Sequence, residues 1–465
     1  MIFTQAIFPV FLVACLAIYW TLKSNQLRQL FLLAASFFFY GYWDWRFLSL
    51  LILVILVAWA TPRLSDKYPE FKGKILTSSI ILLLGQLAVF KYFNFFIGSF
   101  ESLLITLGIE TSTTTLSIIL PVGISFFTFQ AISFIVDTNR KHIANDTNLL
   151  AVSLYIAFFP QLVAGPIVRA VDFIPQLDKS RTFQINLITK GIALFVLGFL
   201  YKAVISDNIA PFVDLIFLSP EKYDSTVVIA GTIGFYAQIY FDFAGYSTMA
   251  IGIAYLFGYT LCDNFNYPYA SFSIVDFWRR WHMSLSSWLK DYLYIAVGGN
   301  RGGELMRYRN LFITMILGGL WHGASWAFIL WGTLHGIALT INHFWSAHIG
   351  KKLPNFWLTL SVYWFLTQFF VLLCWIPFRS ENFTDVWVIL NAFSPFNEST
   401  GIPTIIPWAL LLAPLFIDTL VKPSRRIEIL NKQNPLVLAC LSAVIFAIAL
   451  AFMRTEVQAF IYFQF

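Results

Sequence analysis

Long apolar runs, each close to the length of a bilayer crossing, constrain this chain more than any other feature. A helix needs about 20 such residues to cross the hydrocarbon core. Hydrophobic residues make up 58% of the 465 positions and charged residues only 12%, whereas soluble domains are roughly 25% charged. Because the runs lack the alternation of barrel strands, we expect an all-α polytopic membrane protein. The candidate spans are 4–22, 29–44, 46–61, 75–97, 116–136, 186–206, 227–257, 357–377, 403–421 and 435–453.

The short loops between these runs alternate in charge. Basic residues gather in 62–74 and 137–149, whereas acidic residues prevail in 98–115 and 207–225. Lys and Arg concentrate on the cytoplasmic side of membrane proteins, so the N-terminus is expected outside. The first run has neither the basic flank nor the cleavage site of a signal peptide, and we expect it to be a retained span.

Two apolar regions do not fit as single crossings. The regions 150–168 and 309–345 each have basic residues on both sides, which predicts that both ends of each are cytoplasmic. The first contains the helix-breaking sequence FFPQLVAGP, and the second turns at GGLWHGAS (318–325). Irregular backbone at membrane depth is tolerated only inside protein or beside a wet cavity. We therefore expect two re-entrant helical regions in addition to about 10 or 11 transmembrane helices.

The region 262–309 is aromatic and basic, and too charged to cross a membrane. Residues 274–294 are expected to form a helix with Ser273 as its N-cap. Aromatic and apolar residues recur every three or four positions, which predicts an interfacial helix with its apolar side against the bundle. This stripe comprises Trp278, Trp281, Leu285, Trp288 and Tyr292, while Arg279, His282 and Lys290 lie off it.

Three histidines matter for possible chemistry. His322 lies at the turn of the second re-entrant region, where an imidazole could act as a general base. Alternatively, it is a structural histidine bonded to a carbonyl of the broken helix. His282 follows two arginines and could instead be solvated or bonded to lipid headgroups. His335 is expected roughly 20 Å from His322 along a helix, and therefore outside its site, where a packing or cavity-lining role is favoured.

The charged candidates are weaker. Asp242 lies in the middle of an apolar run, where a carboxylate must be neutral, paired or beside a cavity. Asp276 is spaced to pair with Arg279 or Arg280, or it could contact a substrate. Arg169 could hold a phosphate or anchor the chain at the headgroups.

Two further patterns are rejected. His142 and Asp146 stand one residue too close for the HxxxxD pair of other acyltransferases. The four cysteines have no paired spacing, and three of them lie in apolar runs, so neither a metal site nor a disulfide is predicted.

The stretches DFWRRWHMSLSSWLKDYLYIAVGGNR (276–301) and GGLWHGASWAFILWGTLHG (318–336) resemble the membrane-bound O-acyltransferase superfamily. Within it, the chain is most similar to the bacterial branch containing the alginate O-acetyltransferase membrane subunit. Three upstream segments agree with this resemblance, although Ala296 stands where the family often has proline. These segments are PVGISFFTFQAISFIVD (121–137), FFPQLVAGPIVR (158–169) and YFDFAGYSTMAIGIAYLFGY (240–259).

The resemblance implies one domain, 1–465, with N-terminal helices (1–115), a catalytic core (116–345) and C-terminal helices (346–465) around a central tunnel. It implies that His322 is catalytic and that His282 supports it or lines the donor side. The other residues expected to contact substrate or line the tunnel are Trp321, Asp242, Asp276, Arg279, Arg280, Trp281, Arg169 and Gln130.

The same resemblance implies an enzyme of the bacterial inner membrane that moves an acetyl group from a cytoplasmic thioester to a hydroxyl. The donor is acetyl-CoA or another acyl thioester, without a bound cofactor. The product is an O-acetylated exopolysaccharide such as alginate, or an O-acetylated cell-wall glycan. The implied partners are the bilayer, a periplasmic or outer-side acetyltransferase protein and a cytoplasmic acyl carrier. Nucleic acid is not expected as a partner, because the basic residues are dispersed in short loops.

Two alternatives remain open at this stage. The first is D-alanyl transfer to teichoic acid by the same fold, although the GGNR extension favours the alginate branch. The second is a secondary transporter, since transporters also use broken helices and intramembrane charges. Against it, we find no internal repeat relating the two halves of the chain.

Overall fold

A computed structural model describes residues 1–109, 118–350, 356–394, 433–455, 458 and 460–463. Every regular element in these ranges is helical, as the sequence predicts. The chain divides into two compact units. Unit 1 comprises Met1–Gln184 and Ile253–Leu261, and unit 2 comprises Ile185–Gly252 and Cys262–Phe465. The predicted single domain, its three parts and the central tunnel stay predictions.

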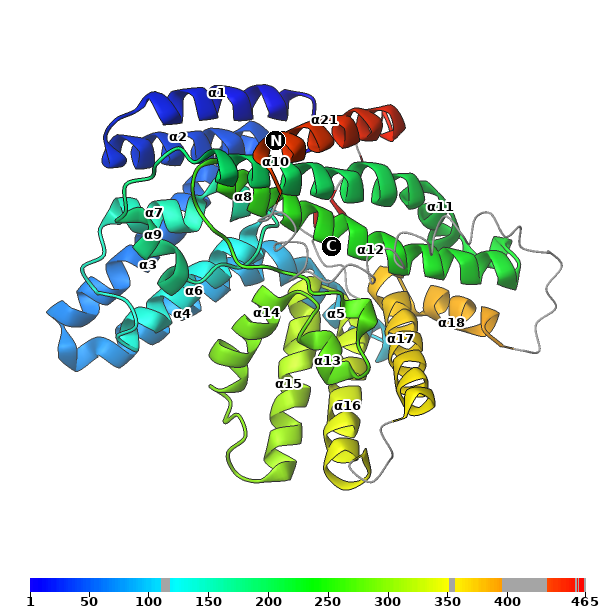
Figure 1. The fold of residues 1–465 in the computed structure, drawn as a ribbon. Coiled ribbons are helices and arrows are strands. Elements are labelled where there is room, and N and C mark those ends of the chain that lie inside the picture. The colour runs from blue at the N-terminus through cyan, green and yellow to red at the C-terminus, as the bar shows by residue number, and fades with distance from the viewer. Residues whose placement is uncertain (110–117, 351–355, 395–432, 456–457, 459, 464–465) are drawn as a thin grey trace. The chain divides into compact units, whose positions relative to one another are not determined.

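Unit 1 is built from the N-terminal helices. A tight turn joins α2 to the next helix, because α2 ends at Asp44, whose side chain accepts a hydrogen bond from the backbone N–H of Arg46. The predicted helix break is confirmed, since α7 stops at Ala157, before Pro160. The helices are α1 (Ile7–Thr21), α2 (Asn25–Asp44), α3 (Leu48–Lys67), α4 (Lys72–Leu87), α5 (Phe93–Thr106), α6 (Ile124–Asn139), α7 (Leu149–Ala157), α8 (Phe159–Leu162) and α9 (Ala170–Leu177) (Figure 1).

Unit 2 carries the candidate site. Its interior helix is α12. In the most apolar 18-residue stretch of α12, 72% of the stretch is buried, compared with only 17% for α21. The helices are α10 (Ile185–Phe199), α11 (Asp207–Leu218), α12 (Ser225–Leu256, within unit 2 up to Gly252), α13 (Ile274–Trp278), α14 (Met283–Trp288), α15 (Glu304–His322), α16 (Trp326–His348), α17 (Trp357–Arg379), α18 (Phe383–Ala392) and α21 (Pro435–Phe452), with π-helical turns at Leu200–Ser206 and Leu289–Tyr294 and a short 3-10 turn at Ile461–Phe463.

Glycines let α10 and α12 approach each other at backbone distance. A Cβ built on Gly198 would lie 2.5 Å from the carbonyl oxygen of Gly245, and one built on Gly252 would lie 2.6 Å from that of Gly191. Small residues at such contacts are typical of helix packing in membranes. The close approach brings the C-terminal end of α10 and the turn after it against the middle of α12.

Replacing Gly198 with alanine is expected to destabilise unit 2, because overpacking a helix contact costs about 1–3 kcal/mol. Thermal unfolding of the detergent-solubilised protein measures this loss. Gly85→Ala in α4 is the matched control, since a Cβ there would have no neighbour within 4 Å, and helix propensity favours alanine by about 1 kcal/mol. Equal effects of both substitutions would contradict the close helix contact.

The prediction of one continuous helix over 274–294 is wrong. Ser273 caps α13 as expected, by accepting a hydrogen bond from the N–H of Asp276 at 3.1 Å. The helix then ends at Trp278, and α14 begins only after His282, whose φ of 42° is left-handed. The residues between the two helices therefore form a bend that turns the His282 side chain into the interior, where none of it is exposed.

Helices α15 and α16 form an antiparallel hairpin that reverses at residues 323–325 (Figure 1). The reversal lies in the predicted turn sequence, and Ser325 caps α16 by accepting from the N–H of Phe328. Glycines again permit backbone contact, because a Cβ on Gly319 would lie 2.3 Å from the carbonyl oxygen of Phe328. The hairpin is thus part of the fold, while its re-entrant course in a bilayer stays a prediction.

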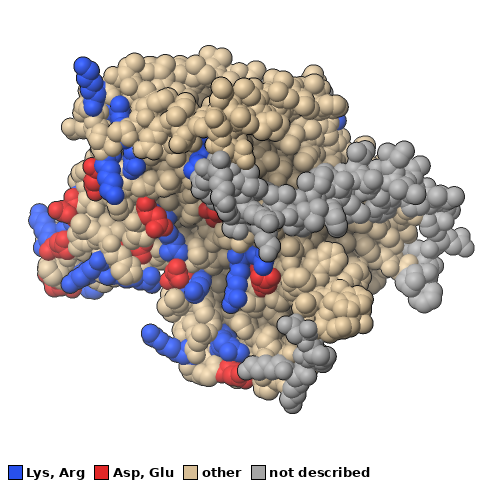
Figure 2. Space-filling model, in the orientation of Figure 1, with Lys and Arg blue, Asp and Glu red and all other residues tan. Residues whose placement is uncertain are grey.

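The protein is a multi-pass membrane protein. Among the described residues, six helical stretches are long and apolar enough to cross a membrane. Charged side chains are scattered over an otherwise uncharged face in Figure 2. The predicted span 403–421 lies outside the described residues, and the number of crossings and the side of the N-terminus stay predictions. The six stretches are Asn25–Lys67, Pro69–Thr106, Ile185–Leu218, Ser225–Leu256, Trp357–Arg379 and Pro435–Phe452.

Candidate active site

His322 ends α15 and is buried in unit 2, with 3% of its surface exposed. Aromatic rings surround its imidazole. Their centroids lie 4.9 to 5.5 Å away, so that little space for bulk water remains beside the ring. These rings belong to Trp321 at 5.0 Å, Trp331 at 4.9 Å, Phe378 at 5.2 Å and Tyr462 at 5.5 Å.

The structure brings His282 to the same site. The indole of Trp321 lies between the two imidazoles, with its centroid 5.9 Å from that of His282 and 5.0 Å from that of His322. On its other side, His282 meets Phe243 of α12 edge to face at 4.6 Å. The two histidines that the resemblance singled out therefore share one buried aromatic cluster, although they come from separate elements.

Asn264 fixes the tautomer of His282. Its Oδ1 accepts from the backbone N–H of Ser284, which can only donate, and this identifies the atom as the carbonyl oxygen. The same oxygen lies 3.0 Å from Nδ1 of His282. Nδ1 must therefore carry the proton and donate it, which leaves the lone pair on Nε2. Asn264 itself is oriented by donating to Oγ of Ser247 at 3.1 Å.

His282 lies between α13 and α14, outside the six candidate spans, and burial lowers its pKa to about 3. Its imidazole is therefore neutral at physiological pH. A neutral imidazole in a fixed tautomer can accept a proton or a hydrogen bond at Nε2, but it supplies no positive charge. This arrangement suits a supporting polar role beside His322 better than anion binding.

His335 has the packing role that the sequence favoured, but it lies nearer to His322 than the predicted separation of roughly 20 Å. The hairpin turn reverses the chain, so that α16 returns alongside α15 and Trp331 touches both imidazoles, at 4.9 Å from His322 and 4.8 Å from His335. Nδ1 of His335 accepts a hydrogen bond from the indole of Trp278 at 3.3 Å. His335 thus packs behind Trp331, as part of the wall around His322.

Asp242 is paired, which is one of the three states that its sequence context allows. Its Oδ1 lies 2.5 Å from Nζ of Lys202, in the π-helical turn after α10. Its Oδ2 accepts the backbone N–H of Ile461 at 2.9 Å. The carboxylate is therefore fully engaged within unit 2, and its predicted place in a tunnel wall stays a prediction.

The basic and aromatic candidates of the 276–281 stretch take different positions. Arg280 forms the helical ion pair with Asp276 at 2.8 Å, and about a third of each side chain is exposed. Trp281 is 1% exposed and packs on Trp375, with ring centroids 4.9 Å apart. Trp281 therefore belongs to the buried core of unit 2, whereas the ion pair between Asp276 and Arg280 lies near the surface of that unit.

Arg169 and Gln130 belong to unit 1, and their predicted roles at the site stay predictions. Arg169 precedes α9 and is half-buried. Gln130, in α6, is 1% exposed, and neither polar atom of its side-chain amide has a hydrogen-bond partner among the described residues.

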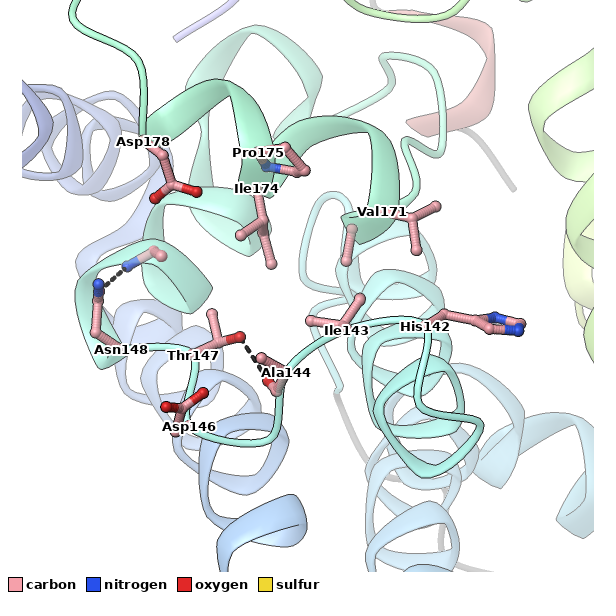
Figure 3. A pocket seen from close by; sticks show the side chains of 12 residues that line it. His142, Ile143, Ala144, Asp146, Thr147, Asn148, Val171, Ile174, Pro175 and Asp178 are labelled. Carbon is pink, nitrogen blue, oxygen red and sulfur yellow. Dashed lines mark hydrogen bonds between the residues drawn. The ribbon is translucent and has the colours of Figure 1, made fainter.

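Unit 1 has a pocket of its own, of about 390 Å³, between the loop before α7 and the length of α9 (Figure 3). His142 and Asp146 both line it. The ionic partner of His142 is Asp137, whose Oδ1 lies 3.8 Å from its Nδ1. The side chain of His142 points away from Asp146 in Figure 3, which agrees with the rejection of these two residues as a catalytic pair.

Sequence reasoning missed three residues that shape the site. Lys202 could have been found, because a lysine inside an apolar run requires an anionic partner and Asp242 has the same unusual context. Asn264 and Tyr462 gave no local signal. Asn264 lies in an irregular loop 18 residues before His282, and Tyr462 follows the last apolar run, far along the chain from His322.

Comparisons with known proteins identify the family of this chain. The sequence profile of MBOAT, the membrane-bound O-acyltransferase family, matches residues 37–379. A probable alginate O-acetylase AlgI of Azotobacter vinelandii is 38% identical, over 86% of this chain and 79% of the relative. A peptidoglycan O-acetyltransferase of Helicobacter pylori is 35% identical, over 81% of this chain and 75% of the relative.

A more distant match is the teichoic acid D-alanyltransferase of Bacillus subtilis, 32% identical over 51% of this chain and 63% of the relative. All three relatives carry names of acyl-transfer enzymes, which leaves the transporter alternative without support. The profile match covers most of the chain and includes His282 and His322. This protein is therefore an O-acyltransferase and belongs to the membrane-bound O-acyltransferase family.

Proposed function

We propose that this protein transfers an acetyl group from a cytoplasmic thioester to a hydroxyl acceptor on the outer side of a bacterial inner membrane, with its N-terminus outside. His322 is the catalytic base and His282 supports it. The observation that carries the proposal is the burial of His322 among aromatic rings, one indole away from a second histidine of fixed tautomer.

The reaction needs one proton acceptor. His322 takes the proton of the acceptor hydroxyl while the oxygen forms an ester bond with the acyl carbon. The carbon–sulfur bond then breaks, and the leaving thiolate takes the proton from the His322 imidazolium, which restores the base. The rings of Trp321, Trp331 and Tyr462 keep bulk water from the imidazole, which limits hydrolysis of the thioester.

The donor is a substrate rather than a resident cofactor, and it is either acetyl-CoA or another acyl thioester. A CoA or carrier thioester brings phosphate groups, which arginine binds well. Arg279 and Arg280 lie on the stretch expected to face the cytoplasm, and Arg280 is about a third exposed beside Asp276. We propose that this stretch meets the anionic part of the donor.

The acceptor is an envelope polysaccharide, such as alginate or a cell-wall glycan, or a partner protein that passes the acetyl group to it. Relatives named for alginate and peptidoglycan O-acetylation each cover more than 80% of this chain, whereas the D-alanyltransferase match covers only 51%. Acetyl transfer is therefore favoured over D-alanyl transfer.

Deleting the gene from its host and analysing the esters of the envelope polymers tests this proposal. We expect O-acetyl esters to be lost, D-alanyl esters to be unchanged, and the wild-type gene to restore acetylation where a His322→Phe gene does not. Loss of D-alanyl esters with intact acetylation would reject acetyl transfer in favour of the alternative.

A further inference from the structure

Three charged side chains form a buried cluster at the centre of unit 2. Nζ of Lys202 lies 2.5 Å from Asp242 and 2.6 Å from Asp207, and the exposed fractions of these side chains are 2%, 2% and 6%. Burying charges costs free energy that pairing offsets only in part, and replacing such pairs by apolar residues is often neutral or stabilising. Packing alone therefore does not account for this cluster.

The cluster reaches the last residues of the chain through Asp242. Its Oδ2 accepts the N–H of Ile461, 219 residues further on, in a fully buried hydrogen bond. Residues 460–463, here named the C-terminal segment, are thereby fixed at the backbone. Asp207 lies on the other side of Lys202, and its electrostatic partner near the end of the chain is Arg454, outside the C-terminal segment.

The C-terminal segment contacts both halves of the candidate site. The ring of Tyr462 lies 5.5 Å from His322 and 4.6 Å from Phe243, which itself touches His282. Phe460 packs on Tyr246 of α12 at 4.9 Å. One hydrogen bond to Asp242 therefore holds the backbone between Phe460, which packs on α12, and Tyr462, which contacts His322.

We propose that Asp242 is a positioning residue, whose buried carboxylate holds the C-terminal segment so that Tyr462 covers His322. This inference rests on the proposed role of His322. Lys202 belongs to the same device, because it fixes one oxygen of Asp242 and leaves the other directed at Ile461, whereas Asp207 makes no contact with the described residues of the C-terminal segment.

The chemistry of the two donors explains why an aspartate is required. Asp242 accepts on Oδ1 from Lys202 and on Oδ2 from Ile461, and both donors have no acceptor capacity. Asparagine has a single acceptor oxygen, so one donor would face an NH₂ group in either orientation. The π-helical turn Leu200–Ser206 presents Lys202, together with Ser206, whose Oγ donates to Oδ1 at 3.3 Å.

Thiol labelling in membranes tests the proposal without relying on activity. In a full-length chain with Cys262→Ser and Cys440→Ser, Phe460→Cys places a reporter thiol in the C-terminal segment. Its reaction with a membrane-permeant maleimide should be slow, because residue 460 is fully buried. Asp242→Asn should speed labelling at least about tenfold, since one unmatched donor is enough to release the segment.

Two matched variants isolate the hydrogen bond. Asp207→Asn removes a charge from the same cluster and should leave labelling within about twofold, because it leaves the Asp242–Ile461 bond intact. Ile461→Pro removes the N–H donor without touching the buried charges, and should speed labelling as Asp242→Asn does. Cys374, 1% exposed in α17, should stay unlabelled throughout and reports that unit 2 remains folded.

Slow labelling in both Asp242→Asn and Ile461→Pro would overturn the proposal, as would equal acceleration by Asp207→Asn. If Asp242→Asn exposed Cys374 by unfolding unit 2, Ile461→Pro would still decide the question. Chains without the reporter should show acetyl transfer reduced at least about tenfold by Asp242→Asn and unchanged by Asp207→Asn. If the variants release the C-terminal segment but the wild-type protein transfers no acetyl group, the proposed function is rejected. The role of Asp242 in holding the segment would still stand.

Discussion

Replacing His322 with phenylalanine is expected to lower acetyl transfer by roughly a thousandfold, because a positioned general base contributes about 10²- to 10⁴-fold to rate. Phenylalanine keeps a ring among Trp321, Trp331 and Phe378, so that packing changes little while the proton acceptor is lost. Incorporation of labelled acetyl from acetyl-CoA into envelope polymer by isolated membranes measures the effect.

His348→Ala is the matched histidine control for this experiment. Its side chain is exposed near the end of α16, and its Nδ1 contacts the carbonyl oxygen of Phe344. We expect this variant to transfer acetyl at the wild-type rate. If His322→Phe were as active as His348→Ala, while both were present at wild-type amounts, His322 would not be the base.

Replacing Asn264 with leucine is expected to reduce acetyl transfer by about a hundredfold. Leucine removes the oxygen that accepts from Nδ1 of His282 and from Ser284, so the imidazole loses its fixed tautomer and orientation. A displacement of about 1 Å in a catalytic arrangement costs about 10²-fold. The same membrane assay, with protein amount measured by immunoblot, gives the rate per molecule.

Asn264→Asp separates this positioning role from simple packing. A carboxylate keeps an acceptor for the Nδ1–H of His282, and the hydroxyl of Ser247 can rotate to donate to it in place of accepting. We therefore expect the aspartate variant to retain activity within about tenfold of wild type. Equal losses in the leucine and aspartate variants would mean that the carbonyl oxygen of Asn264 does not orient His282.

Features that depend on local sequence were predictable. The hairpin turn at 323–325, the Ser273 cap and the helix break before Pro160 follow from glycine, serine and proline, whose effects act within a few residues. The position of His322 at that turn was predictable for the same reason. The pairing of Asp242 was one of three states that its context allowed, because a buried carboxylate has few alternatives.

Features that depend on distant contacts were not predictable. The apolar period of three to four residues continues through residues 278–288, so nothing local indicates the left-handed bend at His282. That bend is held by Asn264, through backbone and side-chain hydrogen bonds to residues 282–284. Likewise, only the folded chain shows that Ile461 reaches Asp242.

The place of His335 was predictable only in part. Its packing role was expected, but the separation of roughly 20 Å from His322 was too long. Both imidazoles contact the ring of Trp331, which lies one helical turn before His335 on α16. A distance counted along the chain could not show that one large ring contacts both histidines.

Transfer of acetyl to hydroxylamine, compared with transfer to the hydroxyl acceptor, tests the role of His322 most directly. Neutral hydroxylamine is already a strong nucleophile and needs no base to deprotonate it. In His322→Phe membranes supplied with acetyl-CoA, we predict roughly thousandfold slower transfer to polymer hydroxyls, but acetyl hydroxamate formation close to the wild-type rate. Equal losses for both acceptors would show that His322 serves donor binding or folding, and would contradict its role as the catalytic base.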